Sequence, residues 1–355
     1  MATVDLAIVG GGLCGAAIGY QCAKLGIDVL LIERCTLGGG GATQHSRGIV
    51  RLYDPNHALM RWAYEGVDCW RNWEIPGPTP FNGCGVVTLL SEQNVDKARR
   101  AILEYHRESY RLILFDHASL VDKCPWLKKA NASLCDEFAI FEPDGGYCNP
   151  RLAAALYGHA MRELGGTVLE GATVTHIEST RSCVKMSIDG RPVEAKLAVL
   201  AAGADASKLV APLQISTVPI WLSCFQGEIR FPTSCVVDET TDTYLRPEPR
   251  GYFYCGGADD AGRGIDDPVV AMDVVNREHE KKCSDLLCDP PSRPVYGIRG
   301  ADGYTPDHLP LLGFGDDHPT LCLATGFSGR GAKYIPAVAK HLSSEIRDRL
   351  KGSLA

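Results

Sequence analysis

Three glycines near the N-terminus have the spacing of a phosphate-binding loop. Gly10, Gly12 and Gly15 form the pattern G-x-G-x-x-G, and Glu33 follows 18 positions after Gly15. The first glycine permits a tight turn, the second lets a pyrophosphate approach the backbone, and the third lets helix and strand pack closely. A carboxylate at Glu33 accepts a hydrogen bond from a ribose hydroxyl and disfavours a 2′-phosphate. These residues predict a dinucleotide site but do not distinguish FAD from NAD.

The segments around this loop have the pattern that it needs. Residues 4–9 are short and apolar, as in a buried parallel strand, and residues 13–25 have the composition of an Ala-rich helix closed by Gly26. Residues 27–32 form a second apolar stretch that ends at Glu33. Together they predict a β-α-β unit.

Further along the chain, helices and strands alternate. Asn149 and Pro150 are suited to the cap and first position of a helix that ends near residue 165. We expect residues 215–300 to be rich in strands. The other expected helices are 56–74, 95–109 and 331–350, and the other expected strands are 86–90, 168–177, 184–188, 197–200 and 321–324.

The composition excludes several classes of protein. The chain has 355 residues, is 45% hydrophobic and carries a net charge of −7, as in an ordinary globular protein. There is no basic excess to hold nucleic acid, and no apolar run approaches the roughly 20 residues of a membrane span. Because no basic n-region or cleavage site stands before Asp5, we expect no secretory signal. The 15 cysteines are scattered, with no C-x-x-C pair and no zinc spacing. We therefore expect no metal site, thiols packed as small apolar groups, and a cytoplasmic location.

Four segments resemble the FAD-dependent amine oxidases of the D-amino acid oxidase superfamily, which includes glycine oxidase and monomeric sarcosine oxidase. They are the fingerprint through Arg34, the run Gly41-Ala-Thr-Gln-His-Ser-Arg-Gly-Ile-Val-Arg51, the segment Tyr244-Leu-Arg-Pro-Glu248 with Gly256-Gly257, and the C-terminal segments Arg299…Tyr304-Thr-Pro-Asp307 and Gly326-Phe-Ser-Gly-Arg-Gly331. They span nearly the whole chain. The resemblance therefore implies FAD as the cofactor.

The resemblance also implies an α/β fold with two interleaved domains. A Rossmann-like FAD-binding domain would gather residues 1–75, 145–205 and 295–355 around a parallel sheet. A substrate domain with a mixed, largely antiparallel sheet would comprise residues 76–144 and 206–294. The substrate would lie where the two domains meet.

The cofactor residues follow from the matching segments. Thr43 stands where the family usually has a serine that meets the pyrophosphate, and Val174 falls on a strand that reads the adenine edge. The glycines at 326, 329 and 331 would aim amides of the last helix at the flavin. His45 could tune the flavin or make a plain loop hydrogen bond. The predicted cofactor-binding residues are Gly10, Gly12, Leu13, Cys14, Gly15, Glu33, Arg34, Ala42, Thr43, His45, Val174, Ala202, Gly203, Gly326, Ser328, Gly329, Arg330, Gly331 and Lys333.

A carboxylate substrate needs a cation, and arginine is well suited because its planar fork meets both oxygens. By resemblance, Arg51 and Lys333 align with the carboxylate-binding pair of sarcosine-oxidase-like members, and Arg299 aligns with the arginine of glycine oxidase and D-amino acid oxidase. Some of these cations could instead bridge domains or hold the flavin phosphates. The predicted substrate-site residues are Arg51, Lys333, Arg299, Tyr244, Arg246 and Tyr254.

The chain departs from the sarcosine-oxidase branch at two places. That branch attaches FAD to a cysteine just before a Tyr-Thr pair, whereas Asp302-Gly303 precede Tyr304 here. We therefore expect noncovalent FAD. That branch also uses a lysine near the flavin for O₂, and our alignment puts Tyr254 there. Whether O₂ or another acceptor reoxidises the flavin thus stays open.

These residues predict oxidation of the C–N bond of a small amino acid or N-alkyl amino acid to an imine, which water hydrolyses. One alternative is a flavoprotein that oxidises a residue within a partner protein or a carrier-bound intermediate. A second is a flavin binder without turnover. A closed, small pocket would favour the first interpretation, and an exposed apolar patch would favour the partner protein.

Overall fold

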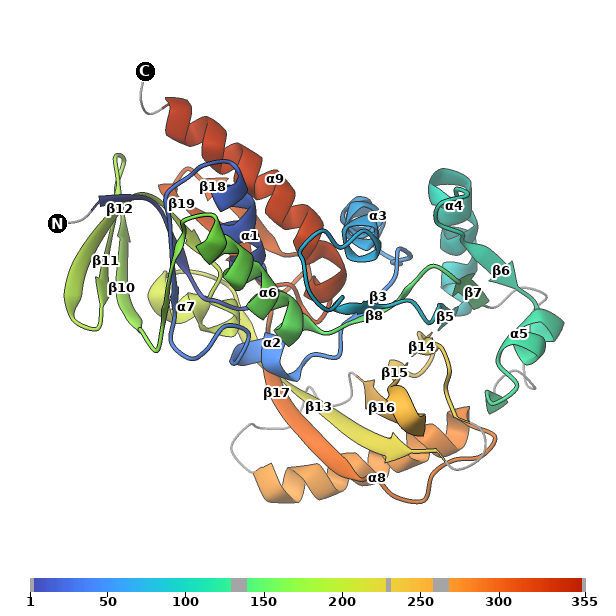
Figure 1. The fold of residues 1–355 in the computed structure, drawn as a ribbon. Coiled ribbons are helices and arrows are strands. Elements are labelled where there is room, and N and C mark those ends of the chain that lie inside the picture. Colours follow the sequence, from blue (N-terminus) through green and yellow to red (C-terminus); the bar gives the residue numbers. More distant parts are fainter. Residues whose placement is uncertain (1–2, 129–138, 228–230, 258–267, 353–355) are drawn as a thin grey trace.

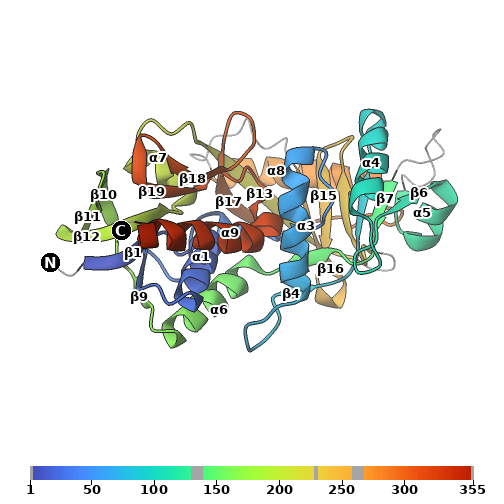
Figure 2. The same ribbon diagram turned by 90° about the horizontal axis from the view of Figure 1, so that it is seen from above.

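The computed structural model describes residues 3–128, 139–227, 231–257 and 268–352. The chain forms two large sheets joined through a small third one (Figure 1). Viewed from above, the first sheet lies at one end of an elongated molecule and the second at the other (Figure 2). This confirms the mixed α/β class with a Rossmann-like unit.

The glycine loop lies in the predicted β-α-β unit, formed by β1 (Thr3–Val9), α1 (Leu13–Lys24) and β2 (Val29–Glu33). Nearly all of α1 is buried because it is enclosed by α6 (Pro150–Glu163) and α9 (Gly331–Gly352). Asn149 caps α6 by accepting from the amide of Leu152 at 3.1 Å, as the sequence predicts.

The first large sheet has the order β10-β11-β12-β1-β2-β9, with β19 on β12 and β18 on β19. β1 pairs in parallel with β12 and β2, β2 with β9, and β12 with β19. Antiparallel hairpins add β10, β11 and β18. The remaining strands of this sheet are β9 (Thr167–Glu170), β10 (Val174–Ser179), β11 (Val184–Ile188), β12 (Arg191–Leu200), β18 (Leu311–Gly315) and β19 (His318–Thr325).

The second large sheet has the order β17-β13-β16-β15-β14-β5-β7-β6. Every pair is antiparallel except β14 with β5, which confirms the largely antiparallel expectation. Its strands are β5 (Val86–Leu89), β6 (Ile113–Phe115), β7 (Ala139–Glu142), β13 (Ser216–Gln226), β14 (Cys235–Asp238), β15 (Thr243–Pro247), β16 (Tyr252–Gly257) and β17 (Tyr296–Tyr304).

One helix of this half was not predicted. α8 (Pro268–Leu286) lies within the segment expected to be rich in strands, and it packs along one face of the sheet (Figure 1). The expectation was therefore wrong for these residues, because their scattered valines resemble a strand pattern unless the neighbouring sheet face is known. The domain ranges stay a prediction. β17, however, lies in the second sheet although its residues fall in the range predicted for the cofactor domain.

Shorter elements connect the two sheets. The expected helix at 56–74 is α3 (His57–Arg71), and the one at 95–109 ends earlier, as α4 (Val95–Tyr105). α2 (Gly41–His45) lies between the sheets, next to β17 (Figure 1). The remaining elements are β3 (Ile49–Val50), β4 (Phe81–Asn82), β8 (Gly146–Cys148), α5 (His117–Lys123), α7 (Ala206–Leu209) and 3₁₀ turns at 92–94, 203–205 and 249–251. No helix in the described part of the chain is long and apolar enough to cross a membrane.

Candidate active site

The glycine loop forms a cradle with no room for side chains. Gly10 has a φ of +107°, and a Cβ there would lie 2.5 Å from the carbonyl oxygen of Ala201. A Cβ at Gly15 would lie 1.9 Å from the carbonyl oxygen of Gly10. The loop therefore requires glycine both for its left-handed backbone and for the close contact between helix and strand.

Polar groups around the cradle fit a dinucleotide. The Thr43 hydroxyl accepts from the amide of Leu13 at 3.0 Å, which brings the α2 segment to the N-terminus of α1. Glu33 is 8% exposed and accepts from the amides of Gly11 at 2.6 Å and Cys35 at 2.8 Å. The first amides of a helix lack intrahelical acceptors and attract anions. Pyrophosphate and ribose groups of FAD therefore fit here.

Other predicted cofactor residues surround the same end of the first sheet. Cys14 is buried, and its thiol donates to the carbonyl of Ala324 at 3.5 Å. Arg34 pairs with Asp205 at 2.8 Å, and Val174 is buried at the start of β10. The hydroxyl of Thr325 donates to the carbonyl of Gly203 at 2.9 Å. Ala42 lies in α2. Ala202 lies close to the glycine loop, since its Cα would be 3.2 Å from a Cβ at Gly10.

The turn before α9 is tied to the end of β17. Gly326, Ser328 and Gly329 all have positive φ. The amide of Ser328 donates to the carbonyl of Gly303 at 3.1 Å, and the amide of Gly329 donates to Asp302 at 3.0 Å. Burial raises the pKa of Asp302, against the hydrogen bonds that it accepts from the amides of Gly303 and Gly329. Asp302, in the region where the sarcosine-oxidase branch has its flavin-linking cysteine, thus holds this turn.

Lys333 and Arg330 form a charge cluster around the buried carboxylate of Asp54. The Lys333 ammonium lies 2.7 Å from Asp54, and Arg330 lies 3.4 Å from it. Burial would raise the pKa of Asp54, but Lys333, Arg330 and Arg51 outweigh it and hold this pKa well below its usual range. Burial lowers the pKa of Lys333 to about 8 despite the carboxylate. At neutral pH both groups are charged, so Asp54 already serves as the anion for Lys333.

Arg51 lies next to this cluster but bonds elsewhere. Its guanidinium donates to the hydroxyl of Thr88 on β5 at 2.7 Å and lies 5.7 Å from the centre of the Tyr53 ring. Asp54 was not among the predicted residues, because a single aspartate in a loop has no pattern that marks it before the fold brings α9 to its side.

A second group of predicted residues lines a cavity of about 250 Å³ beside α2. Tyr244, Arg246 and Tyr254 lie on one face of the second sheet, since Tyr244 pairs with Gly256 and Arg246 pairs with Tyr254. The residues that line the cavity are Gln44, Ser46, Arg47, Cys148, Asn149, Arg151, Arg246, Glu248 and Tyr254. Arg47, Arg151 and Cys148 were not predicted as site residues.

Arg246 is the most enclosed cation of this cavity. It is 4% exposed, it donates to Glu248, and its guanidinium lies 3.7 Å from the centre of the Tyr147 ring. Its Nε has no hydrogen-bond partner among the described residues. A buried donor without a partner costs about 1–3 kcal/mol. This Nε is closed off from the cavity, so it offers no contact to a ligand there.

His45 borders the same sheet, whereas Arg299 does not share the cavity face. A Cβ at Gly300 would lie 2.6 Å from the Cβ of His45. Burial and Arg47 lower the pKa of His45, so it is neutral at pH 7. β17 pairs with β13 without a break, so its successive residues alternate between the two faces of the sheet. Gly300 faces His45, and its neighbour Arg299 therefore points to the opposite face. A Cβ at Gly297, on that opposite face, would meet Met272 of α8. The structure therefore does not bring Arg299 together with Arg246 and Tyr254.

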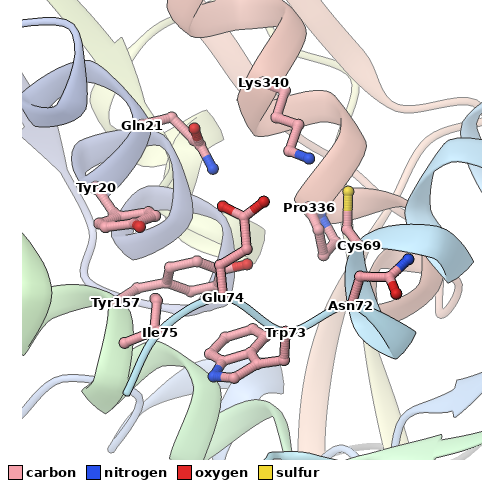
Figure 3. Close-up of a pocket in the computed structure, with 10 residues that line it drawn as sticks. All are labelled: Tyr20, Gln21, Cys69, Asn72, Trp73, Glu74, Ile75, Tyr157, Pro336 and Lys340. Atoms are coloured by element: carbon pink, nitrogen blue, oxygen red, sulfur yellow. The ribbon is translucent and has the colours of Figure 1, made fainter.

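A second, smaller hollow lies among α1, α3, α6 and α9 (Figure 3). Its volume is about 20 Å³, which leaves room for about one water molecule. Gln21, Glu74 and Lys340 point toward one another in it (Figure 3). It is too small for a substrate.

Comparison with known proteins decides the family. Residues 5–345 match the DAO family, described as FAD dependent oxidoreductase. This chain belongs to that family. The description of the family names FAD, the cofactor that the cradle fits.

Individual relatives are more distant. N-methyl-L-tryptophan oxidase of Yersinia pestis (strain Pestoides F) is 25% identical over 233 residues, which span 64% of this chain and 61% of that protein. Glycine oxidase from Geobacillus kaustophilus has a TM-score of 0.79 at 21% identity, over 98% of this chain and 95% of its own. L-proline dehydrogenase from P. horikoshii has a TM-score of 0.80 at 20% identity, over 98% and 94%. The matching segment spans less than two thirds of the oxidase, and the two structures share the DAO-family fold.

Proposed function

We propose that this protein oxidises the C–N bond of a small amino acid or N-alkyl amino acid, and that the cavity beside α2 receives the substrate. FAD, when bound, supplies the two-electron acceptor for the hydrogen on the carbon next to the amine. The product is an imine, which water hydrolyses. The named relatives include an N-methyl amino acid oxidase, a glycine oxidase and a proline dehydrogenase, which supports this class.

One observation carries this proposal, namely that Arg246, a 4% exposed cation held over the Tyr147 ring, lines the cavity. A substrate carboxylate would accept from the guanidinium of Arg246, whose planar fork would orient it. Tyr254 lies beside Arg246 on the same sheet face, and its hydroxyl bonds to that of Tyr296 at 2.6 Å. The cavity is of small-molecule size, which favours a metabolite over a residue within a partner protein.

Arg51 and Lys333 remain the competing carboxylate site predicted from the sequence. Lys333 already pairs with Asp54, and neither Arg51 nor Lys333 lines the cavity beside α2. The guanidinium of Arg51 bonds to Thr88 through one nitrogen, which leaves its other N–H groups for a carboxylate. Arg246 and Arg51 are thus two candidate sites for the substrate carboxylate, and mutations can distinguish between them.

Steady-state kinetics of Arg246→Gln and Arg51→Gln, each loaded with FAD, provide the test. We expect Arg246→Gln to raise KM for an amino acid substrate by about 30-fold or more, because losing one partner of a desolvated charge pair costs about 2–5 kcal/mol. Arg51→Gln should change KM much less. The substrate comes from anaerobic screening of amino acids and amines for flavin bleaching.

The reverse outcome, a raised KM only in Arg51→Gln, would move the carboxylate site to Arg51 and overturn the cavity assignment. If no amino acid or amine bleaches the flavin, the proposed activity itself is wrong. The FAD content of each variant, read from its absorbance, shows whether a kinetic change comes from the substrate or the cofactor.

A further inference from the structure

The cavity beside α2 carries more positive charge than one carboxylate can neutralise. Three arginines line it, Arg47, Arg151 and Arg246, and Glu248 is the single acidic residue. Glu248 accepts from Arg246, which leaves two guanidinium charges without an anion. Among the described residues, neither Arg47 nor Arg151 forms an ion pair, and the bonds of Arg47 go to the carbonyls of its own loop at 3.1 and 3.4 Å.

The rest of the lining is polar as well. Gln44, Ser46 and Asn149 contribute amide and hydroxyl groups, and the Tyr254 ring lies 4.7 Å from the Arg47 guanidinium. Asn149 also caps α6, so the cavity adjoins the N-terminus of a 14-residue helix, where anions are favoured. An apolar side chain would find little apolar surface here and would leave guanidinium groups unpaired, which is costly.

Arg246 shows that this is a built site. It is 4% exposed, its guanidinium lies 3.7 Å from the centre of the Tyr147 ring, and it lines the cavity. The remaining two arginines are less enclosed and come from other elements, Arg47 from the loop after α2 and Arg151 from α6. Cations from three separate elements thus converge on a space of about 250 Å³.

We propose that this cavity takes an amino acid or N-substituted amino acid that bears a second acidic group. Its first carboxylate binds Arg246, as in the proposed function, and the two acidic groups together offset the net charge of +2 that the three arginines and Glu248 leave in the lining. The inference rests on the proposed function, because it names the substrate class of that same site.

Binding of non-oxidisable acids tests it without turnover. The FAD-loaded enzyme is titrated with succinate and glutarate, and with butyrate and valerate as monoacids of equal chain length, following the flavin absorbance. We expect the diacids to bind at least about tenfold more tightly, a difference of about 1.4 kcal/mol. Arg47→Gln and Arg151→Gln should each reduce this preference, whereas Arg181→Gln, an exposed arginine outside the cavity, should leave it unchanged.

Equal affinity for diacids and monoacids would overturn the inference. So would variants that weaken FAD binding, measured by flavin fluorescence, while the diacid preference persists, because the arginines would then serve the cofactor. Anaerobic bleaching by aspartate, glutamate and their N-methyl derivatives, compared with asparagine and glutamine, separates the two proposals. If neutral amino acids bleach the flavin as well as acidic ones do, the inference fails and the proposed function stands. If none bleaches it, the proposed function fails.

Discussion

Asp54 binds three partners that come from α9 or directly precede it. Its carboxylate lies 2.7 Å from the Lys333 ammonium, accepts from the Tyr334 hydroxyl at 2.6 Å, and lies 3.4 Å from Arg330. Two of these partners were predicted to contact FAD or substrate directly. At the scale of single residues, Lys333 is 4% exposed and its ammonium already bonds to Asp54.

Replacing Asp54 with Asn tests this role. Removing one partner of a buried ion pair leaves Lys333 uncompensated, so we expect a loss of about 3–5 kcal/mol in the free energy of unfolding at pH 7. The pKa of Asp54 is depressed in the fold, so its contribution is present above about pH 4 and is lost as the pH falls further. The stability gap between wild type and variant should therefore narrow in acid.

Urea unfolding at pH 7 and pH 3 measures both effects. Asp96→Asn serves as the control, because its pair with Arg99 at 3.0 Å is exposed and such pairs contribute little. A gap that stays constant with pH would show that Asp54 acts through packing and not through its charge.

At the scale of elements, α9 contains a proline that its neighbour α3 compensates. Pro336 has no amide to donate to the carbonyl of Ala332 one turn earlier. The indole Nε1 of Trp70 on α3 donates to that carbonyl at 2.8 Å instead. Gly66 lets the helices approach, since a Cβ there would lie 1.9 Å from the carbonyl oxygen of Lys333. The contact between α3 and α9 thus positions the segment that carries Lys333.

Trp70→Phe should lower the free energy of unfolding by more than Trp221→Phe does. Both indoles are fully buried, so each change removes similar volume. Trp221 Nε1 has no partner among the described residues, whereas loss of the Trp70 bond leaves the Ala332 carbonyl unsatisfied, at about 1–3 kcal/mol. Thermal unfolding of both variants measures the difference, and equal shifts in Tm would argue against a structural role for the hydrogen bond.

At the scale of the whole molecule, the two sheets meet where α2 and the end of β17 lie together, close to the turn before α9. The position that would carry a flavin-linking cysteine belongs to this junction, and Asp302 there holds the turn by accepting from Gly329. We predict that acid precipitation of the holoprotein leaves a yellow supernatant and a colourless pellet. A yellow pellet would mean that FAD is attached covalently.

Tyr254 on β16 bears on which electron acceptor reoxidises the flavin. Tyr254 stands where our alignment places the lysine that assists O₂ in the sarcosine-oxidase branch, and its hydroxyl is bonded to Tyr296. Without an ammonium to stabilise reduced oxygen, we expect reoxidation of the reduced enzyme in air to be as slow as that of free flavin. Stopped-flow mixing with aerated buffer measures this rate, and rapid reoxidation would identify an oxidase.

The sequence by itself determined the family, the cofactor and the β-α-β unit. Gly10, Gly12, Gly15 and Glu33 act within one short stretch, so their spacing alone carries the chemistry. The missed helix α8 shows the limit of local patterns, because it packs on a sheet whose strands come from distant parts of the chain.

Only the tertiary structure decided which cations come together. Lys333 meets Asp54 across 279 positions of sequence, and Arg246 shares a cavity with Arg47 and Arg151 from other elements. Arg299 is directed away from them by the pairing register of β17. Long-range charge pairs and the face of a strand depend on how sheets stack and pair, and no local pattern encodes that arrangement.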